Sequence, residues 1–390
     1  MSGPERLVTA RFALMFLFSF TVFLSAFQLF PTAPFHILSL GGSRSEAGLF
    51  LGFLTYASAV SAPVTGAVAD RLGKRRVLLA CSSVIAAFSA LYAVVPAYQL
   101  MLGLAIVHGV FWSGLLSASG AYVTDAVPPS RRAEGLSYWG FASIIAVAMA
   151  PSIGLWVFDR GGWAALCAEA TILNVLMAAI AWRLPPDVPR PHAMPHRLQD
   201  LVEWRVLVLG ITLFLYAFSY GGITSFAALH AEAQGVTPRA LYFTAFAVAI
   251  ILTRPFIARY ADQEGHRRVI IPCLVAVAAG VALLSMATTR TGFVVSAFVF
   301  GTGFGSAYPI FVAHLMKRVD QQRRGATFGA LIGAFDTGIG TGSIAMGWLS
   351  DHYGLGRAFA VAASLAALSI PYYFFMEKRP WITSDSARPA

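Results

Sequence analysis

Long apolar stretches alternate with short polar segments along the whole chain of 390 residues. A helix that crosses the hydrocarbon core of a bilayer needs about 20 mainly apolar residues. Alternating segments of about ten residues, which are typical of a transmembrane barrel, are absent. The pattern therefore predicts an all-α polytopic membrane protein with twelve transmembrane helices at residues 10–34, 47–69, 77–96, 99–123, 138–158, 163–182, 205–228, 240–260, 269–288, 292–315, 327–349 and 357–376.

The N-terminus has a basic start followed by an apolar run, as a secretory signal peptide does. This run continues to about Phe35, whereas the apolar region of a signal peptide usually has about 7–15 residues. It also lacks a clear cleavage site with small residues. We therefore interpret it as the first membrane span, retained in the protein.

The overall composition excludes an ordinary soluble protein. Apolar residues make up 57% of the chain and charged residues only 12%, against about 25% charged residues in soluble domains. A water-exposed surface made from this mixture would be largely apolar. We therefore expect lipid to be the solvent for much of the chain.

The 28 Lys and Arg residues indicate how the spans are oriented. With the N-terminus in the cytoplasm, 22 of them lie in segments predicted to be cytoplasmic and 5 in outer turns, and Arg254 lies within a span. Such an excess of basic residues in cytoplasmic loops is the positive-inside rule. It places both termini in the cytoplasm, and it accounts for the net charge of +10 without a nucleic-acid partner.

The sequence also repeats itself at a constant offset of 192 residues. Matches on Pro, Asp, Arg, Cys and Trp fall in three separate loops, which predicts a duplicated six-helix unit. We expect two pseudo-symmetric bundles, residues 1–182 and 205–390, joined by a cytoplasmic linker at 183–204. The matched pairs are Pro63 and Pro255, Asp70 and Asp262, Gly73 and Gly265, Arg75 and Arg267, Arg76 and Arg268, Cys81 and Cys273, Arg131 and Arg323, Arg132 and Arg324, Trp156 and Trp348, Asp159 and Asp351, and Gly162 and Gly354.

Cysteine and histidine do not indicate a metal site or a cofactor. Cys81, Cys167 and Cys273 lie in apolar stretches without CxxC spacing, so we expect them to pack as small apolar side chains. His192 and His196 have the spacing of a metal-binding pair on a helix, but the neighbouring prolines oppose a helix there. We expect neither a metal nor a cofactor.

The loop after the second span reads GAVADRLGKRR at residues 66–76. It resembles the signature loop of the major facilitator superfamily of transporters, in which Gly, Asp-Arg, Gly and basic residues recur at this spacing. The second half has a decayed copy, ARYADQEGHRR. The motif residues are Gly66, Asp70, Arg71, Gly73, Lys74 and Arg75 in the first copy and Asp262, Gly265, Arg267 and Arg268 in the second.

The residues of this motif suit a tight turn that faces another helix. Gly73 would allow the turn, and Gly66 would allow close approach of a neighbouring helix. Asp70 can face the positive N-terminal end of a helix in the opposite half. The resemblance implies that Asp70 and Arg71 form a gate that locks the halves together on the cytoplasmic side. The alternative is a basic loop that serves only to orient the chain.

The fifth span bears on the direction of transport. Drug–proton antiporters of the superfamily carry a glycine-rich fifth span and an Arg in the fourth, and this chain resembles them only loosely. The segments GTGFGSAYPI and FDTGIGTG are similar to those of bacterial sugar- and drug-efflux members, which implies a bacterial inner (plasma) membrane. The positions compared are Ala150, Pro151, Gly154 and Leu155 in the fifth span, and Ala105, where the Arg is missing, and His108 in the fourth.

Charges within spans are costly, and their presence suggests a function. Asp336 lies 12 residues beyond Arg324, which corresponds to about 18 Å along a helix and places it near mid-membrane. It is a candidate for carrying a proton, and the alternative is a structural acid bonded to a nearby donor. Arg254 could bind an anionic substrate or pair with Asp336, or its side chain could extend to the cytoplasmic interface.

Two further residues are candidates for proton coupling. Glu169 lies about 10 Å inside the outer end of the sixth span, where an acid of the outer vestibule is the alternative to a protonation site. His108 could titrate near neutral pH, but it could equally be a core histidine.

Substrate contacts are expected from the first and seventh spans, which line the cavity in this superfamily. Gln28 and Tyr220 occupy equivalent positions in the two halves, and Tyr216 lies one turn before Tyr220. Amide and aromatic groups can bind a polar organic solute. Hydrogen bonds between helices are the alternative role.

The sequence therefore predicts a secondary active transporter of a small organic solute that works by alternating access, with proton-coupled efflux (antiport) as the first choice. Proton-coupled or facilitated uptake would use the same residues. An enzyme is not expected, because HExxH and GxSxG are absent, and GxxxxGK[ST] for ATP-driven transport is absent too. A non-transporting receptor is a further, less favoured alternative. We expect a monomer whose partners are the solute, protons and the bilayer.

Overall fold

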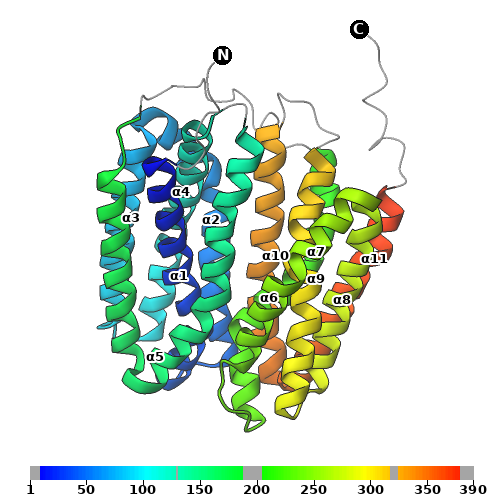
Figure 1. Cartoon of the computed structure of the whole chain (residues 1–390). Coiled ribbons are helices and arrows are strands. Elements are labelled where there is room, and N and C mark those ends of the chain that lie inside the picture. The colour runs from blue at the N-terminus through cyan, green and yellow to red at the C-terminus, as the bar shows by residue number, and fades with distance from the viewer. Residues whose placement is uncertain (1–8, 129–130, 188–203, 317–323, 378–390) are drawn as a thin grey trace.

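The computed structural model describes residues 9–128, 131–187, 204–316 and 324–377. These residues form eleven helices and contain no strand, which confirms the all-α fold (Figure 1). The helices are α1 (Ala10–Ser39), α2 (Arg44–Leu72), α3 (Lys74–Tyr92), α4 (Tyr98–Ala126), α5 (Arg132–Arg183), α6 (Trp204–Ala233), α7 (Leu241–Glu264), α8 (His266–Met286), α9 (Arg290–Met316), α10 (Arg324–Tyr353) and α11 (Leu355–Glu377).

Helix α5 has 52 residues and is broken at Gly162, whose φ of 69° and ψ of −169° are not helical. An unbroken helix of that length would extend about 78 Å, more than twice the hydrocarbon thickness of about 30 Å. Its second part runs back along the bundle: Trp163 donates to the carbonyl of Tyr92 at the end of α3, whereas the Trp182 carbonyl accepts from Arg75 at the start of α3. The predicted spans 138–158 and 163–182 are thus the two parts of α5.

The lengths and sequences of the helices are those of an integral membrane protein. Ten helices in the described part of the chain are long and apolar enough to cross a bilayer, with α5 counted once. Helix α10 is not among these ten, because Gly, Thr and Asp interrupt its apolar sequence. All twelve predicted stretches lie within helices or their immediate ends. A count of twelve crossings therefore depends on the two parts of α5 and on α10.

The helices form two groups that stand side by side, α1 to α5 and α6 to α11 (Figure 1). We call these groups the first and second halves. They meet mainly where α2 packs on α10 and where α5 packs on α7. The beginning of α1 and the end of α11 lie at the same end of the bundle, which we call the cytoplasmic end after the predicted topology, and the opposite end is the outer end.

The two halves reverse direction at matching glycines. Gly73 and Gly265 have φ values of 94° and 90°, and Gly162 and Gly354 have φ values of 69° and 82°. Positive φ is accessible to glycine without steric cost. The members of each pair are 192 residues apart, so the offset seen in the sequence also relates these turns.

The same offset relates the contacts between helices. Gly109 of α4 lies against the carbonyl of Leu54 in α2, and Gly301 of α9 lies against the carbonyl of Phe246 in α7. A Cβ at Gly109 or Gly301 would overlap that carbonyl, so glycine is what allows the helices to approach.

Candidate functional site

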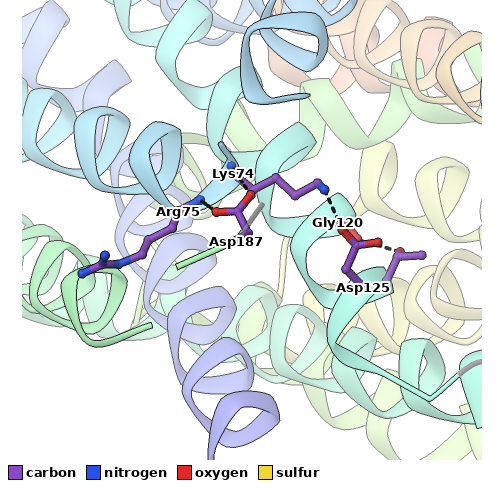
Figure 2. Close-up of polar contacts among 6 residues, drawn as sticks. Lys74, Arg75, Gly120, Asp125 and Asp187 are labelled. Atoms are coloured by element: carbon purple, nitrogen blue, oxygen red, sulfur yellow. Dashed lines mark hydrogen bonds and ion pairs between the residues drawn. The ribbon is translucent and has the colours of Figure 1, made fainter. Parts of the chain in front are cut away.

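The signature loop begins helix α3 with a carboxylate from elsewhere in the chain (Figure 2). Gly73 precedes α3 and has no side chain to cap it. Asp187, which follows α5, accepts hydrogen bonds from the amides of Lys74 at 2.7 Å and Arg75 at 3.0 Å. A carboxylate there satisfies free amides and suits the positive end of the helix.

The basic side chains of the loop also bind within the first half. The Lys74 ammonium forms an ion pair with Asp125 of α4 at 2.6 Å and is almost fully buried, whereas Asp125 is about one-third exposed. The Arg75 guanidinium donates to the carbonyl of Trp182 at the end of α5. The loop is therefore anchored to α4 and to the end of α5.

The residues expected to form the cytoplasmic gate are not engaged. The side chains of Asp70 and Arg71 make no hydrogen bond or ion pair with any residue in the described ranges. Gly66 was expected to allow close approach of a helix, but a Cβ added there would meet nothing within 4 Å. Among the described residues, Asp70 and Arg71 thus form no contact of the kind that the resemblance implies, and the gate stays a prediction.

In the second copy of the motif, Gly265 makes the turn between α7 and α8. Arg268 pairs with Glu264 across that turn. The side chains of Asp262 and Arg267 lie outside the described part of the structure.

At the outer end, α2 and α10 are joined through the N-terminus of α2. Asp351 accepts hydrogen bonds from the amides of Arg44 at 3.1 Å and Ser45 at 2.7 Å, and from the Ser45 hydroxyl at 2.6 Å. Arg44 donates to the carbonyl of Ser350 at 3.1 Å. We call Arg44, Ser45, Ser350 and Asp351 the α2–α10 clasp.

Asp351 follows the predicted span 327–349 and is charged at neutral pH. Partial burial disfavours its charged form, but the hydrogen bonds from Ser45 and the Arg44 amide outweigh this and lower the pKa of Asp351 below its ordinary value. The contact is therefore between a carboxylate and the positive end of a helix.

A second contact joins α5 and α7 at the outer end. Arg239 pairs with Asp159 of the first half at 2.9 Å and with Glu232 of the second at 3.2 Å. Its guanidinium also lies over the ring of Phe35, 4.7 Å from the ring centre. We call Asp159, Glu232 and Arg239 the α5–α7 clasp. Asp159 and Asp351 are partners in the sequence repeat, so corresponding acids close both seams.

Below the α2–α10 clasp, small residues pack along the seam. Ser343 of α10 donates to the carbonyl of Gly48 in α2 at 2.8 Å. About half a turn further from the clasp on α10 and about two turns further on α2, the hydroxyls of Tyr56 and Thr341 lie 2.6 Å apart. These contacts lead directly toward Asp336.

Asp336 lies at the cytoplasmic limit of this seam. Asp336 is half-buried as a residue and faces Ser58 of α2, and Tyr308 of α9 lies within electrostatic reach. Between described residues, the hydrogen bonds and ion pairs that join the two halves lie at this level or closer to the outer end. Asp336 thus lies where the polar contacts of the seam stop.

Arg254 is placed on the other seam and does not pair with Asp336. Its guanidinium lies over the ring of Phe141 in α5, 5.8 Å from the ring centre. No ion pair forms between Arg254 and any acid within the described residues.

Two predicted residues of the first half lie together. The Gln28 amide donates to Glu169 at 3.4 Å, between α1 and the second part of α5. Gln28 is only 1% exposed. The side-chain oxygen of Gln28 and the second carboxylate oxygen of Glu169 are buried, and neither has a hydrogen-bond partner in the described structure. Each is therefore an acceptor without a donor in this arrangement of the helices.

The predicted tyrosines belong to an aromatic cluster in the second half. Tyr216 and Tyr220 stack on Phe304 with ring centres 4.9 Å and 4.2 Å apart. Phe335 and Tyr308 extend the cluster to the residue next to Asp336. Aromatic faces and a carboxyl therefore lie together.

His108 lies in the core of the first half. Its Nδ1 is 3.3 Å from the Tyr92 hydroxyl, and its ring lies parallel to that of Phe88. His108 thus lies where a core histidine would, which the sequence analysis gave as the alternative to a proton-coupling residue. Among the described residues, no group of three His, Cys, Asp or Glu side chains could hold a metal.

Sequence reasoning did not identify the two clasps as functional. Asp159 and Asp351 were recognised as partners in the repeat, and this was the available signal. No sequence pattern pointed to Arg239 or Ser45, because the acids that they bind in the other half lie 80 and 306 positions away along the chain.

Comparisons with known proteins agree with this architecture. The chain matches the Major Facilitator Superfamily over residues 15–242 and 209–390. It is 25% identical over 351 residues to YhhS, an uncharacterized MFS-type transporter of Escherichia coli strain K12, covering 87% of this chain and 86% of that protein. An uncharacterized MFS-type transporter of Pseudomonas aeruginosa strain LESB58 is 28% identical over 342 residues, covering 85% and 84%.

Solved structures show the same fold. A mutant of the nucleoside transporter NupG superposes with a TM-score of 0.78 at 15% identity, covering 94% of this chain and 100% of that one. The human organic anion transporter MFSD10 superposes with a TM-score of 0.72 at 17% identity, covering 95% and 100%.

Proposed function

This chain belongs to the major facilitator superfamily of membrane transporters, and we propose that it moves a small organic solute across a bacterial inner membrane by alternating access coupled to protons. In this mechanism two halves rock about a central site, so that the site opens to one side at a time. A transporter of this family is not an enzyme.

The clasps support an assignment of this state as closed to the outside. Both seams are joined at their outer ends by charged contacts, and Asp70 and Arg71 are unengaged at the cytoplasmic end. In the opposite state the clasps would separate, and Asp70 would engage the second half.

The position of Asp336 is the observation that supports proton coupling. It is a half-buried acid halfway along α10, in the seam that must open and close. A carboxylate within the membrane must be paired, hydrated or protonated, and the side chain that hydrogen-bonds to Asp336 is the uncharged Ser58. Loss of hydration when the halves rock would favour the protonated form, so the proton would move with the conformational change.

The substrate is proposed to be a polar organic molecule with a flat, unsaturated part. Stacked tyrosine and phenylalanine rings suit such a group, and the unpaired oxygens of Gln28 and Glu169 suit its donors. The structural likeness to NupG, a nucleoside transporter, agrees with this class.

Efflux by proton antiport is our preferred direction, and proton-coupled or facilitated uptake is the alternative. Everted membrane vesicles with an imposed pH gradient distinguish them. Ethidium, uridine and p-aminohippurate represent a cation, a nucleoside and an organic anion. Antiport predicts that at least one of the three dissipates the gradient, and Asp336→Asn should abolish the response.

A test of Asp336 that needs no substrate uses Gly333→Cys. Gly333 lies about one turn from Asp336 in open space, so a cysteine fits there. The three native cysteines are first replaced by alanine. We expect the rate of alkylation by a membrane-impermeant maleimide to change between pH 5 and 8, and to be constant in Asp336→Asn. Glu134→Gln, which removes an exposed acid, is the control. An unchanged pH dependence in Asp336→Asn would remove Asp336 from the mechanism.

A further inference from the structure

An apolar groove of about 290 Å³ lies between α7, α8 and α9. Its lining includes Phe256 and Tyr260 of α7, Pro272 and Ala276 of α8, and Thr302 of α9. Arg268 contributes the charged group at its margin. We call this the α7–α9 groove.

The groove opens away from the interior of the second half. Phe304 and Tyr308 of α9 point into the aromatic cluster. Thr302 precedes Phe304 by two residues, about 200° around the helix, so it lies on the opposite face. Phe256 and Tyr260 are 71% and 52% exposed. In an integral membrane protein, such an apolar exposed face contacts lipid.

Its length and charge match one leaflet of a bilayer. Arg268 is at the cytoplasmic end of α8 and its side chain is 72% exposed. Ala276 lies eight residues further along, about 12 Å deeper. One leaflet of the hydrocarbon core is about 15 Å thick. The groove thus runs from the head-group level into the acyl region.

At two positions on the α8 and α9 sides of the groove, the repeat gives the first half bulkier residues. At the offset of 192, Ala276 corresponds to Val84 and Gly303 to Phe111. Gly303 also lines the groove. Arg268 corresponds to Arg76, so the first half has the cation. It lacks the aromatic wall, because Phe256 and Tyr260 correspond to Val64 and Val68.

We propose that the α7–α9 groove binds an acyl chain of an anionic glycerophospholipid of the cytoplasmic leaflet, with the lipid phosphate on Arg268. An acyl chain fills the groove without polar groups to satisfy, and guanidinium binds phosphate through two hydrogen bonds. Basic sites at the cytoplasmic ends of helices are where lipid head groups bind.

Glu264 provides a further test of the proposal, because it forms an exposed ion pair with Arg268. A lipid phosphate would compete with this carboxylate for the guanidinium. Neutralising Glu264 should therefore strengthen lipid binding, whereas a purely structural role for Arg268 predicts no gain.

Native mass spectrometry of the delipidated, purified protein tests this with two probes, dioleoylphosphatidylglycerol and dioleoylglycerol, which lacks the phosphate. We expect Arg268→Gln to weaken binding of the phospholipid about tenfold and to leave dioleoylglycerol unchanged. Glu264→Gln should strengthen phospholipid binding. Ala276→Trp, which fills the groove, should weaken both probes.

Arg76→Gln is the matched control, and it should leave binding of both probes unchanged. Thermal unfolding of each variant establishes that it is folded. If Ala276→Trp is not folded, Arg268→Gln and Glu264→Gln still decide the test. Equal binding of both probes to the native protein, or equal effects of Arg268→Gln and Arg76→Gln, would overturn the proposal.

Discussion

At the level of single residues, α2 and α3 share a contact at their first turns that comes from outside the helix, although α2 also has its own cap, because the Ser43 hydroxyl accepts from the Glu46 amide. Each has its first free amides bound by a carboxylate from a distant segment, Asp351 for α2 and Asp187 for α3. The sequence suggested this role for Asp70 at the cytoplasmic end. In the structure, it is Asp351 at the outer end that binds the positive N-terminus of a helix in the opposite half.

Loss of Asp187 should destabilise the first half. Asp187→Ala leaves the amides of Lys74 and Arg75 without their acceptor, which typically costs about 1 kcal/mol for a helix cap. We expect a lower midpoint of thermal unfolding, measured by intrinsic fluorescence in detergent. Glu134→Ala removes an exposed acid whose ion pair should contribute little. Equal midpoints for the two variants would contradict this role.

Asp351 gives the α2–α10 clasp a defined pH dependence. Its pKa is lowered in the closed state, so the clasp is at full strength above the ordinary Asp value of about 3.9 and weakens as pH falls through the lowered value. In Asp336→Asn, we therefore expect the outer end to stay closed from pH 8 to 5. We expect the distance between spin labels at Ser39→Cys and Gln234→Cys to lengthen below about pH 4, and this pH dependence should be absent in Asp351→Asn, which lacks the titrating carboxylate at every pH.

At the level of helices, close packing depends on glycines whose roles differ with the state. Gly109 lies against the backbone of α2, whereas Gly66 has open space beside it. The signature motif indicated that Gly66 is needed, but only the structure shows that it is not used in this state. A contact made in a different conformation leaves no trace in the packing here.

The pair Gly109→Ala and Gly66→Ala separates these roles. Gly109→Ala should cost about 1–3 kcal/mol through overpacking against α2. Gly66→Ala should keep or slightly raise thermal stability, because alanine favours a helix by up to about 1 kcal/mol. We expect Gly66→Ala nevertheless to reduce transport by hindering cytoplasmic closure. Similar unfolding midpoints in both variants would contradict this assignment.

Helix positions followed from apolar length alone, and the predicted spans fall within the observed helices or extend past their ends by at most four residues. The reversal at Gly162 was predicted as a loop between two spans, and its positive φ explains why the helix breaks there. Asp187 could not be assigned, because its partners are more than 110 residues away and only the folded bundle brings them together.

At the level of the whole molecule, the repeat accounts for how two seams can close at once. Asp159 and Asp351 correspond by the offset of 192, yet they bind different partners: the Arg239 side chain in one case, and mainly backbone amides in the other. The sequence identified the corresponding acids but not their partners. Charge contacts at one end of both seams provide a physical basis for holding a single state.

The most direct test of this account measures both ends of the molecule by pulsed electron paramagnetic resonance. Labels at Ser39→Cys and Gln234→Cys report the outer end, and labels at Leu72→Cys and Arg259→Cys report the cytoplasmic end. Asp159→Ala with Asp351→Ala removes both clasps. Glu134→Ala with Glu264→Ala is a control with the same change in charge.

We predict that removal of the clasps lengthens the outer distances and shortens the cytoplasmic distances together, and that the control leaves both unchanged. Outer distances that lengthen while the cytoplasmic distances stay fixed, or distances that do not respond at either end, would contradict two rocking halves held by these clasps.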